Sequence, residues 1–162
     1  MTNAKQITAV LMRSWIKDRA AIPNYVGKGS GGEADLFMVT GSGYCEEVEI
    51  KVTLADFRRD FTKRFKHGCL TNHPDYDFTR SNAHYLWPRR FWFAVPPDLA
   101  DQVAKELGNS IYGLLVVDGL SVVERIKPKP TQGARRLTEK ELLALMRCMT
   151  FRIAKQYQAV QL

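Results

Sequence analysis

Two segments rich in β-forming residues, joined by a short turn, constrain the fold of this chain more than any other feature. Residues 35–40 and 44–52 carry many Val, Ile, Phe, Tyr and Thr side chains, and Gly41-Ser42-Gly43 lies between them. A glycine-containing connection of this length reverses the chain and pairs its flanks as an antiparallel hairpin. The fold must therefore contain a β-sheet that includes this hairpin.

Helices are expected on both sides of the hairpin. Apolar residues at helical spacing between Ile7 and Trp15 predict a first amphipathic helix, which Pro23 is expected to end. Thr53 is a candidate N-cap for a second helix that runs to about Lys66. Phenylalanines at positions 57, 61 and 65 would pack this helix on the sheet.

The second half of the chain adds three strands and two helices. Residues 68–88 form a long irregular connection, and strands are expected over 90–95, 112–117 and 121–126, with a short helix from Pro96 to about Leu107. Thr138 and Glu141 form a capping box at the start of a last helix. The order predicts a single α/β domain over 1–162, a mixed sheet flanked by helices: a core of about 5–126, a basic linker 127–137 and a C-terminal helix 138–160.

The last helix has an apolar face with two possible uses. Leu142, Met146, Met149 and Ile153 recur at helical spacing. This face either packs on the core or joins two copies of the chain in a homodimer.

The charge and the cysteine content of the chain indicate which binding partners and which cellular compartment to expect. The 24 Lys and Arg residues exceed the 17 acidic residues by seven, a balance that suits polyanions such as nucleic acid but also an ordinary basic surface. Three well-separated cysteines read as reduced intracellular thiols. No signal peptide and no apolar run long enough to cross a bilayer is recognised, so we expect a cytoplasmic protein without a membrane partner.

Charged residues at alternate positions of the hairpin indicate a candidate catalytic site. Glu33 and Asp35 begin the first strand, and Glu49 and Lys51 end the second. Residues two apart project to one face of a strand, so the two pairs converge where the chain reverses. The alternative is that these charges form the solvent-exposed face of an antiparallel strand.

A convergent set of this kind suits hydrolysis assisted by a metal ion. Mg²⁺, or Mn²⁺, prefers oxygen ligands, which Asp35, Glu49 and the backbone carbonyl of Ile50 could supply. Lys51 would position the attacking water or offset the charge that develops on phosphorus. These roles predict cleavage of phosphodiester bonds without a covalent intermediate.

The same residues lie in an ordered series that is more specific than any triplet. Ala34-Asp35-Leu36, then Val48-Glu49-Ile50-Lys51-Val52, then Ala55-Asp56-Phe57 with Asp60, resembles the PD-(D/E)XK nuclease superfamily. Within it the chain looks most like the MmcB-like DNA-repair proteins and related phage proteins. The resemblance implies a restriction-endonuclease-like fold and DNA cleavage in repair, recombination or phage DNA processing. It makes Asp35 and Glu49 metal ligands and Lys51 the catalytic lysine.

Two further features follow from the resemblance. The first helix of the superfamily often supplies an additional glutamate; here it offers only Asp18, and Glu33 is the candidate substitute. On the second helix, Asp56, Asp60, Lys63 and His67 form a narrow polar stripe, from which Lys63 is the candidate phosphate contact. Charge pairs on a solvated helix face are the alternative.

Basic and aromatic side chains complete the candidate nucleic-acid interface. The candidate contacts to the DNA backbone are Arg59, Lys63, Arg64, His67, Arg89 and Arg90, with Arg58, Lys66, Arg135 and Arg136 as further basic residues. Tyr76, Tyr85 and Trp87 could stack on an unpaired base. A zinc site at His67, Cys69, His73 and His84 is the weaker alternative, because their spacing matches no common zinc template.

Three functions remain open from the sequence. The first is a Mg²⁺-dependent nuclease that acts on DNA. The second is a DNA-binding module that keeps the nuclease fold without turnover. The third is an interaction protein whose basic face meets an acidic partner protein.

Overall fold

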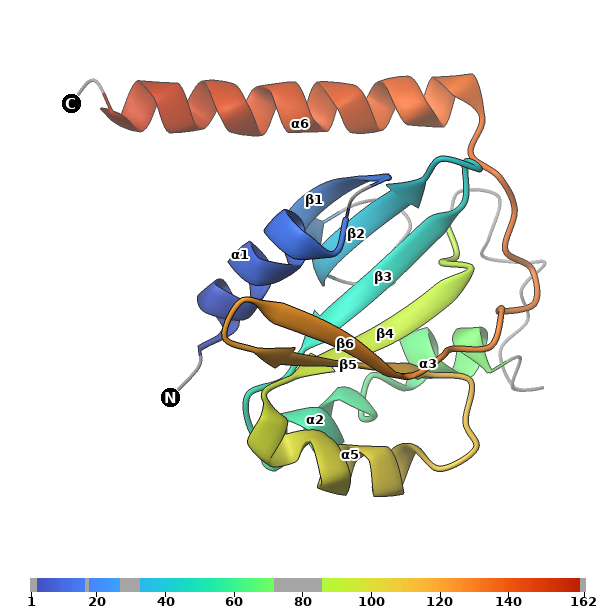
Figure 1. Cartoon of the computed structure of the whole chain (residues 1–162). Helices are drawn as coiled ribbons and strands as arrows, with labels where there is room; N and C mark the ends of the chain where they lie inside the picture. The colour runs from blue at the N-terminus through green and yellow to red at the C-terminus, as the bar shows by residue number, and fades with distance from the viewer. Residues whose placement is uncertain (1–2, 17, 27–32, 72–85, 161–162) are drawn as a thin grey trace.

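A single six-stranded sheet organises the molecule in the computed structural model, which describes residues 3–16, 18–26, 33–71 and 86–160 (Figure 1). The strands lie in chain order: β1 (Arg19–Val26), β2 (Glu33–Thr40), β3 (Cys45–Ile50), β4 (Arg90–Val95), β5 (Gly113–Asp118) and β6 (Ser121–Ile126). The β3–β4 and β4–β5 pairs are parallel, and the other three pairs are antiparallel. The sheet is therefore mixed and open at both edges.

Helices cover both faces of the sheet. On one face, α1 (Ala4–Ser14) packs Ile7 and Leu11 against a cluster that includes Val48 and Trp92. On the other face lie α2 (Leu54–Asp60), α3 (Arg64–Leu70) and α5 (Ala100–Leu107), which follows the short 3₁₀ helix η1 (Pro97–Leu99). The C-terminal helix α6 (Glu139–Val160) packs Leu145 near Phe37 and runs across the β1–β2 end of the sheet (Figure 1).

The expected fold class is confirmed. A mixed sheet is flanked by helices and followed by a C-terminal helix, and the hairpin and later strands lie within a few residues of their expected limits. The capping box at the last helix is also present: Thr138 Oγ1 accepts the Glu141 N–H, and Glu141 Oε2 accepts the Thr138 N–H at 2.8 Å. No helix in the described ranges is long and apolar enough to cross a membrane.

The expectation that the first helix runs until Pro23 is wrong. The helix ends at Ser14, and Pro23 lies inside β1, paired with Leu36. A proline lacks the N–H that a central strand needs, but β1 is an edge strand, where this loss is tolerated. The Arg152 guanidinium of α6 donates to the backbone carbonyls of Pro23 and Asn24, which further satisfies this edge.

The expectation of a single helix over 53–66 is also wrong. Two short helices replace it, because α2 ends at Asp60 and α3 begins at Arg64. Phe57 is buried as expected, whereas Phe61 and Phe65 are each 37% exposed. The Phe61 ring stacks on His67, with their ring centres 4.8 Å apart. The break turns α3 so that its buried side faces the charged residues of β3.

Candidate active site

The end of β3 carries charged side chains in a buried position. All six residues of β3 are buried, and Glu47, Glu49 and Lys51 alternate toward α2 and α3, whereas Val48 and Ile50 contact the α1 side. Because these charges are at most 5% exposed, they do not form a solvent-exposed strand face. Charges so buried must be paired to be tolerated, and the helices supply the partners.

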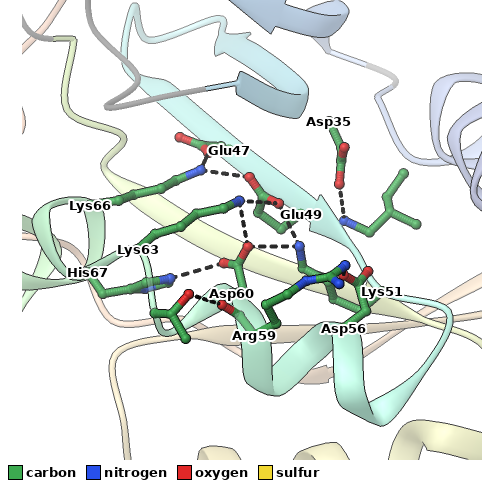
Figure 2. Close-up of polar contacts among 12 residues, drawn as sticks. Asp35, Glu47, Glu49, Lys51, Asp56, Arg59, Asp60, Lys63, Lys66 and His67 are labelled. Carbon is green, nitrogen blue, oxygen red and sulfur yellow. Dashed lines mark hydrogen bonds and ion pairs between the residues drawn. The ribbon is translucent and has the colours of Figure 1, made fainter.

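Lys51 is held between two carboxylates. Its Nζ donates to Glu49 Oε2 at 2.8 Å and to Asp60 Oδ1 at 2.8 Å (Figure 2). Asp60 is the last residue of α2 and is only 2% exposed. The end of α2 therefore fixes the lysine that ends the β3 motif.

Asp60 also gathers the polar groups that follow it. Lys63 Nζ lies 2.7 Å from Asp60 Oδ1, and His67 Nε2 lies 3.0 Å from Asp60 Oδ2. His67 Nδ1 in turn lies 2.8 Å from the hydroxyl of Tyr112. The chain of contacts thus runs from the motif lysine through Asp60 and His67 into the aromatic core.

A second buried lysine pairs with the acids of β3. Lys66 is 2% exposed, and its Nζ contacts a carboxylate oxygen of Glu47 and Glu49 Oε1, the latter at 2.6 Å. Counted together, the acids Glu47, Glu49 and Asp60 match the ammonium groups of Lys51, Lys63 and Lys66 in number. This set of six residues, which we call the charge network, is formally neutral.

Asp35 lies at the margin of the charge network. Its carboxylate accepts the backbone N–H of Ile50 at 2.7 Å, the one hydrogen bond to this carboxylate within the described residues. The side chain is half-buried beside a cavity of about 440 Å³ whose lining residues are Ala4, Lys5, Thr8, Ala9, Met12, Asn24, Asp35 and Ile50. Asp35 is therefore an acid with access to open space.

Burial and neighbouring charges set the protonation of these groups. Burial, and next the Glu49 charge, raise the pKa of Asp35 above its ordinary value. Burial alone would lower the pKa of Lys51, but Glu49 and Asp60 outweigh it and raise that pKa. Burial likewise opposes ionisation of Asp60, yet hydrogen bonds from His67, Lys51 and Lys63 bring its pKa below the ordinary range. The two carboxylates thus favour the ammonium form of Lys51.

The residues present fit a single hard cation in their chemistry. Asp35 and Glu49 occupy neighbouring positions on β2 and β3, and burial together with the Glu49 charge raises the Asp35 pKa. A cation between the two carboxylates would offset their mutual repulsion. Each Glu49 oxygen accepts one lysine donor and keeps a second lone pair. No group of three or more His, Cys, Asp or Glu side chains in the described ranges could hold a metal, so backbone carbonyl, water or phosphate oxygens would complete the ligand set.

Glu33 does not join the other predicted catalytic residues. It is exposed at the start of β2, opposite Val26, and forms no side-chain hydrogen bond or ion pair with another described residue. Asp18 follows α1 instead of lying on it, and pairs with Arg19 at 3.3 Å. Within the described part of the chain, the additional acids near the motif come instead from Glu47 and Asp60.

The residues expected to contact DNA are dispersed. Lys63 is 46% exposed at the charge network, and Arg64 is exposed on α3, whereas His67 is buried and cannot present its ring at the surface. Arg59 is exposed and pairs with Asp56 at 2.6 Å. Of the expected stripe, Asp56 is the member outside the Asp60, Lys63 and His67 contacts.

The two arginines before β4 lie away from the charge network. The Arg89 guanidinium lies 4.2 Å from the ring centre of Tyr44, before β3, and Arg90 pairs with Glu46 at 3.3 Å. Trp87 is buried, which removes it as a surface stacking residue. The remaining stacking candidates, Tyr76 and Tyr85, lie outside the described residues, as do the zinc candidates His73 and His84.

Sequence reasoning missed Lys66 as a site residue and left Asp60 in a general polar stripe. Lys66 was expected only as a further basic residue of the candidate nucleic-acid interface, whereas α3, which begins after the break at Asp60, turns it toward β3. One signal was available for Glu47: it shares the two-residue period of Glu49 and Lys51, so it had to lie on their face.

Comparisons with known proteins identify the fold alone. No family model matches the chain, and no curated protein matches it in sequence. A solved protein of unknown function from Silicibacter pomeroyi has a similar fold, with a TM-score of 0.64 and 17% identity over 99% of this chain and 92% of that one. An XisH family protein from Nostoc punctiforme gives a TM-score of 0.47 and 11% identity over 76% of this chain and 98% of that one.

Proposed function

We propose that this protein is a Mg²⁺-dependent nuclease that hydrolyses phosphodiester bonds in DNA, in repair, recombination or phage DNA processing. The observation that carries the proposal is the placement of Lys51: its ammonium is fixed between Glu49 and Asp60, next to an acid, Asp35, that borders a cavity. The resemblance of the Asp35 to Asp60 series to the PD-(D/E)XK superfamily supports the same chemistry.

Each residue has a distinct task in this proposal. Asp35, Glu49 and the Ile50 carbonyl would hold Mg²⁺, which when bound polarises a phosphate oxygen and acidifies water. Lys51 stays protonated, so it donates hydrogen bonds to the attacking water or to a phosphoryl oxygen. The water oxygen bonds to phosphorus as the bond to the leaving oxygen breaks; one water proton goes to solvent and the leaving oxygen gains one.

Lys63 is suited to substrate binding. It is the charge-network lysine with substantial exposure, and Asp60 holds its ammonium at 2.7 Å. A partly exposed ammonium beside the proposed metal site can contact a phosphate of the bound strand, which would orient the scissile group. Arg64, exposed one residue later, would extend this contact along the backbone.

A DNA-binding module without turnover is the second candidate. Both oxygens of Glu49 already accept lysine donors, so a metal ion must share this carboxylate with two ammonium groups. Glu33 also stays apart from the charge network, which leaves Asp35 without a second acid from β2. An interaction protein that meets an acidic partner protein through its basic face is a further alternative. Binding of the chain to an acidic protein, together with no binding to DNA, would indicate this function.

One experiment separates these functions. The purified chain is incubated with plasmid, single-stranded and branched DNA plus Mg²⁺ or Mn²⁺, and each mixture is examined for both cleavage and a gel shift. A nuclease gives products that are lost in Asp35→Ala, whereas Arg13→Ala, on the exposed side of α1, keeps them. A shift without products indicates the binding module, and neither products nor a shift contradicts both DNA functions.

A further inference from the structure

We infer that the Lys66 ammonium occupies the place of a second divalent cation between Glu47 and Glu49, so that this site takes up one divalent cation and not two. The inference rests on the proposed function, because it concerns the stoichiometry of the same site. It assigns to Lys66 a role that neither its sequence position nor its place on a basic chain suggests.

The position of Lys66 is that of a bridging cation. Its Nζ contacts carboxylate oxygens of both Glu47 and Glu49, as Figure 2 shows, and all three side chains are at most 2% exposed. Two acids two residues apart on one strand face lie about 7 Å apart along the strand. Burial opposes the ionisation of both acids, and a cation between them favours their charged forms. Here that cation is the ammonium, although burial still raises the pKa of Glu47 to about 7.

The two sides of Glu49 differ in this respect. On the Glu47 side, Lys66 fills the space between the acids. On the other side, Asp35 has an N–H donor from Ile50 but no ammonium within ion-pairing distance among the described residues, and it borders a cavity of about 440 Å³. Among the described residues no ammonium bridges Asp35 and Glu49, so a divalent cation that reaches Asp35 from the cavity would share Glu49 with Lys51. On the Glu47 side, Lys66 already bridges both acids.

The consequence concerns the type of phosphodiester chemistry. Two-metal sites hold their ions about 4 Å apart and use a carboxylate that faces both. Glu49 has the central position that such a carboxylate requires, but its Glu47-facing oxygen is taken by Lys66 at 2.6 Å. The fixed ammonium thus supplies the second positive charge that a two-metal enzyme takes from solution.

Manganese binding to the full chain tests this inference without reference to cleavage. Mn²⁺ is titrated into the protein, and bound ions are counted by electron paramagnetic resonance and by calorimetry. We expect one ion for the unmodified chain and for Lys66→Arg, which keeps the charge. We expect two ions for Lys66→Ser, which frees Glu47 and Glu49, and one for the double variant Lys66→Ser with Glu47→Gln. Lys140→Ser, exposed on α6, is the matched lysine-to-serine control and should bind one.

Two ions on the unmodified chain, or one on a folded Lys66→Ser variant, would overturn the inference. If Lys66→Ser does not fold, Glu47→Gln alone decides: unchanged Mn²⁺ affinity supports the inference, and a loss of about tenfold or more makes Glu47 a ligand and overturns it. No ion on the unmodified chain contradicts the proposed function. In that case a gain of one ion in Lys66→Ser still supports the role of Lys66, and no gain overturns it.

Discussion

Asp60 is the residue on which the geometry of the charge network depends most. One carboxylate binds Lys51 and Lys63 through Oδ1 and His67 through Oδ2, and it is 2% exposed. Without it, the ammonium of Lys51 would have Glu49 alone as a close partner. Asp60 thus holds Lys51 in position while it also contacts Lys63 and His67.

Replacement of Asp60 by alanine should destabilise the fold strongly. Removal of one partner from a buried ionic group leaves uncompensated charge, which costs about 3–5 kcal/mol in the free energy of unfolding. Asp56→Ala, four residues earlier on the same helix, removes only the exposed pair with Arg59 and should cost less than about 1 kcal/mol. Urea denaturation of the two variants measures both values. Equal decreases in the free energy of unfolding for the two variants would show that Asp60 stabilises the fold no more than Asp56 does.

At the scale of elements, the parts dictated by local chemistry were predictable. The Gly41-Ser42-Gly43 turn determines the hairpin, and the two-residue period places Glu49 and Lys51 on one face of β3. Thr53 accepts the Asp56 N–H as an N-cap, and the Thr138 capping box begins α6 close to its expected residue. These features depend on a few neighbouring residues, which is why sequence alone reveals them.

The parts that sequence could not predict depend on contacts between distant segments. The break after Asp60 places Phe61 over His67 and orients Lys66 toward β3, and none of these contacts follows from helical periodicity. The strand β1 was not predicted, because a proline such as Pro23 commonly ends a helix. That β1 lies at the edge of the sheet, where a proline is tolerated, depends on the order of all six strands. In α6, the apolar residues divide differently from expectation: Leu142 and Met149 pack on the core, but Met146 is 63% and Ile153 50% exposed.

The start of α6 gives a prediction with a defined pH dependence. Glu141 accepts hydrogen bonds from Arg135, at 2.6 and 2.9 Å, and from the Thr138 N–H, and chiefly the Arg135 bond lowers its pKa to about 2. The unfolded value is about 4.3, so this stabilisation is fully present above that pH and is lost as the pH falls through about 2.

Glu141→Gln should therefore destabilise the protein by about 1 kcal/mol at pH 7, and the difference from the unmodified chain should shrink as the pH falls from about 5 toward 2. The measurement is urea unfolding of both proteins at several pH values. Glu139→Gln, in the same first turn, is the control and should change stability by less than about 0.5 kcal/mol at every pH. A constant difference for Glu141→Gln would contradict the assigned pKa.

For the whole molecule, the charge network leaves the excess of positive charge for the surface. Its three acids and three lysines cancel, so the formal charge of +7 arises elsewhere in the chain. Arg59 and Arg64 add exposed positive charge close in sequence to Lys63, near the proposed site. A surface of this kind attracts a phosphate backbone by releasing counterions.

Binding to DNA should accordingly weaken with salt. About three phosphate contacts, by Arg59, Lys63 and Arg64, predict a slope near −3 in a plot of log affinity against log salt concentration. Arg64→Gln should reduce this slope by about one, whereas Arg13→Gln, exposed near the end of α1, should leave it unchanged. Fluorescence anisotropy with labelled DNA across a KCl series gives the slopes. An affinity that does not respond to salt would favour an acidic protein partner or no DNA function.

The most direct test of the proposed nuclease is whether DNA cleavage depends on both Mg²⁺ and Lys51. The cleavage rate is measured with saturating Mg²⁺, after chelation and after Mg²⁺ is restored, for the unmodified chain, Lys51→Met and the control Lys140→Met. The proposal predicts cleavage that stops on chelation, returns with Mg²⁺, survives in Lys140→Met and falls by about 100-fold or more in Lys51→Met. Cleavage that persists in chelator, or a folded Lys51→Met protein as fast as the unmodified chain, would contradict it.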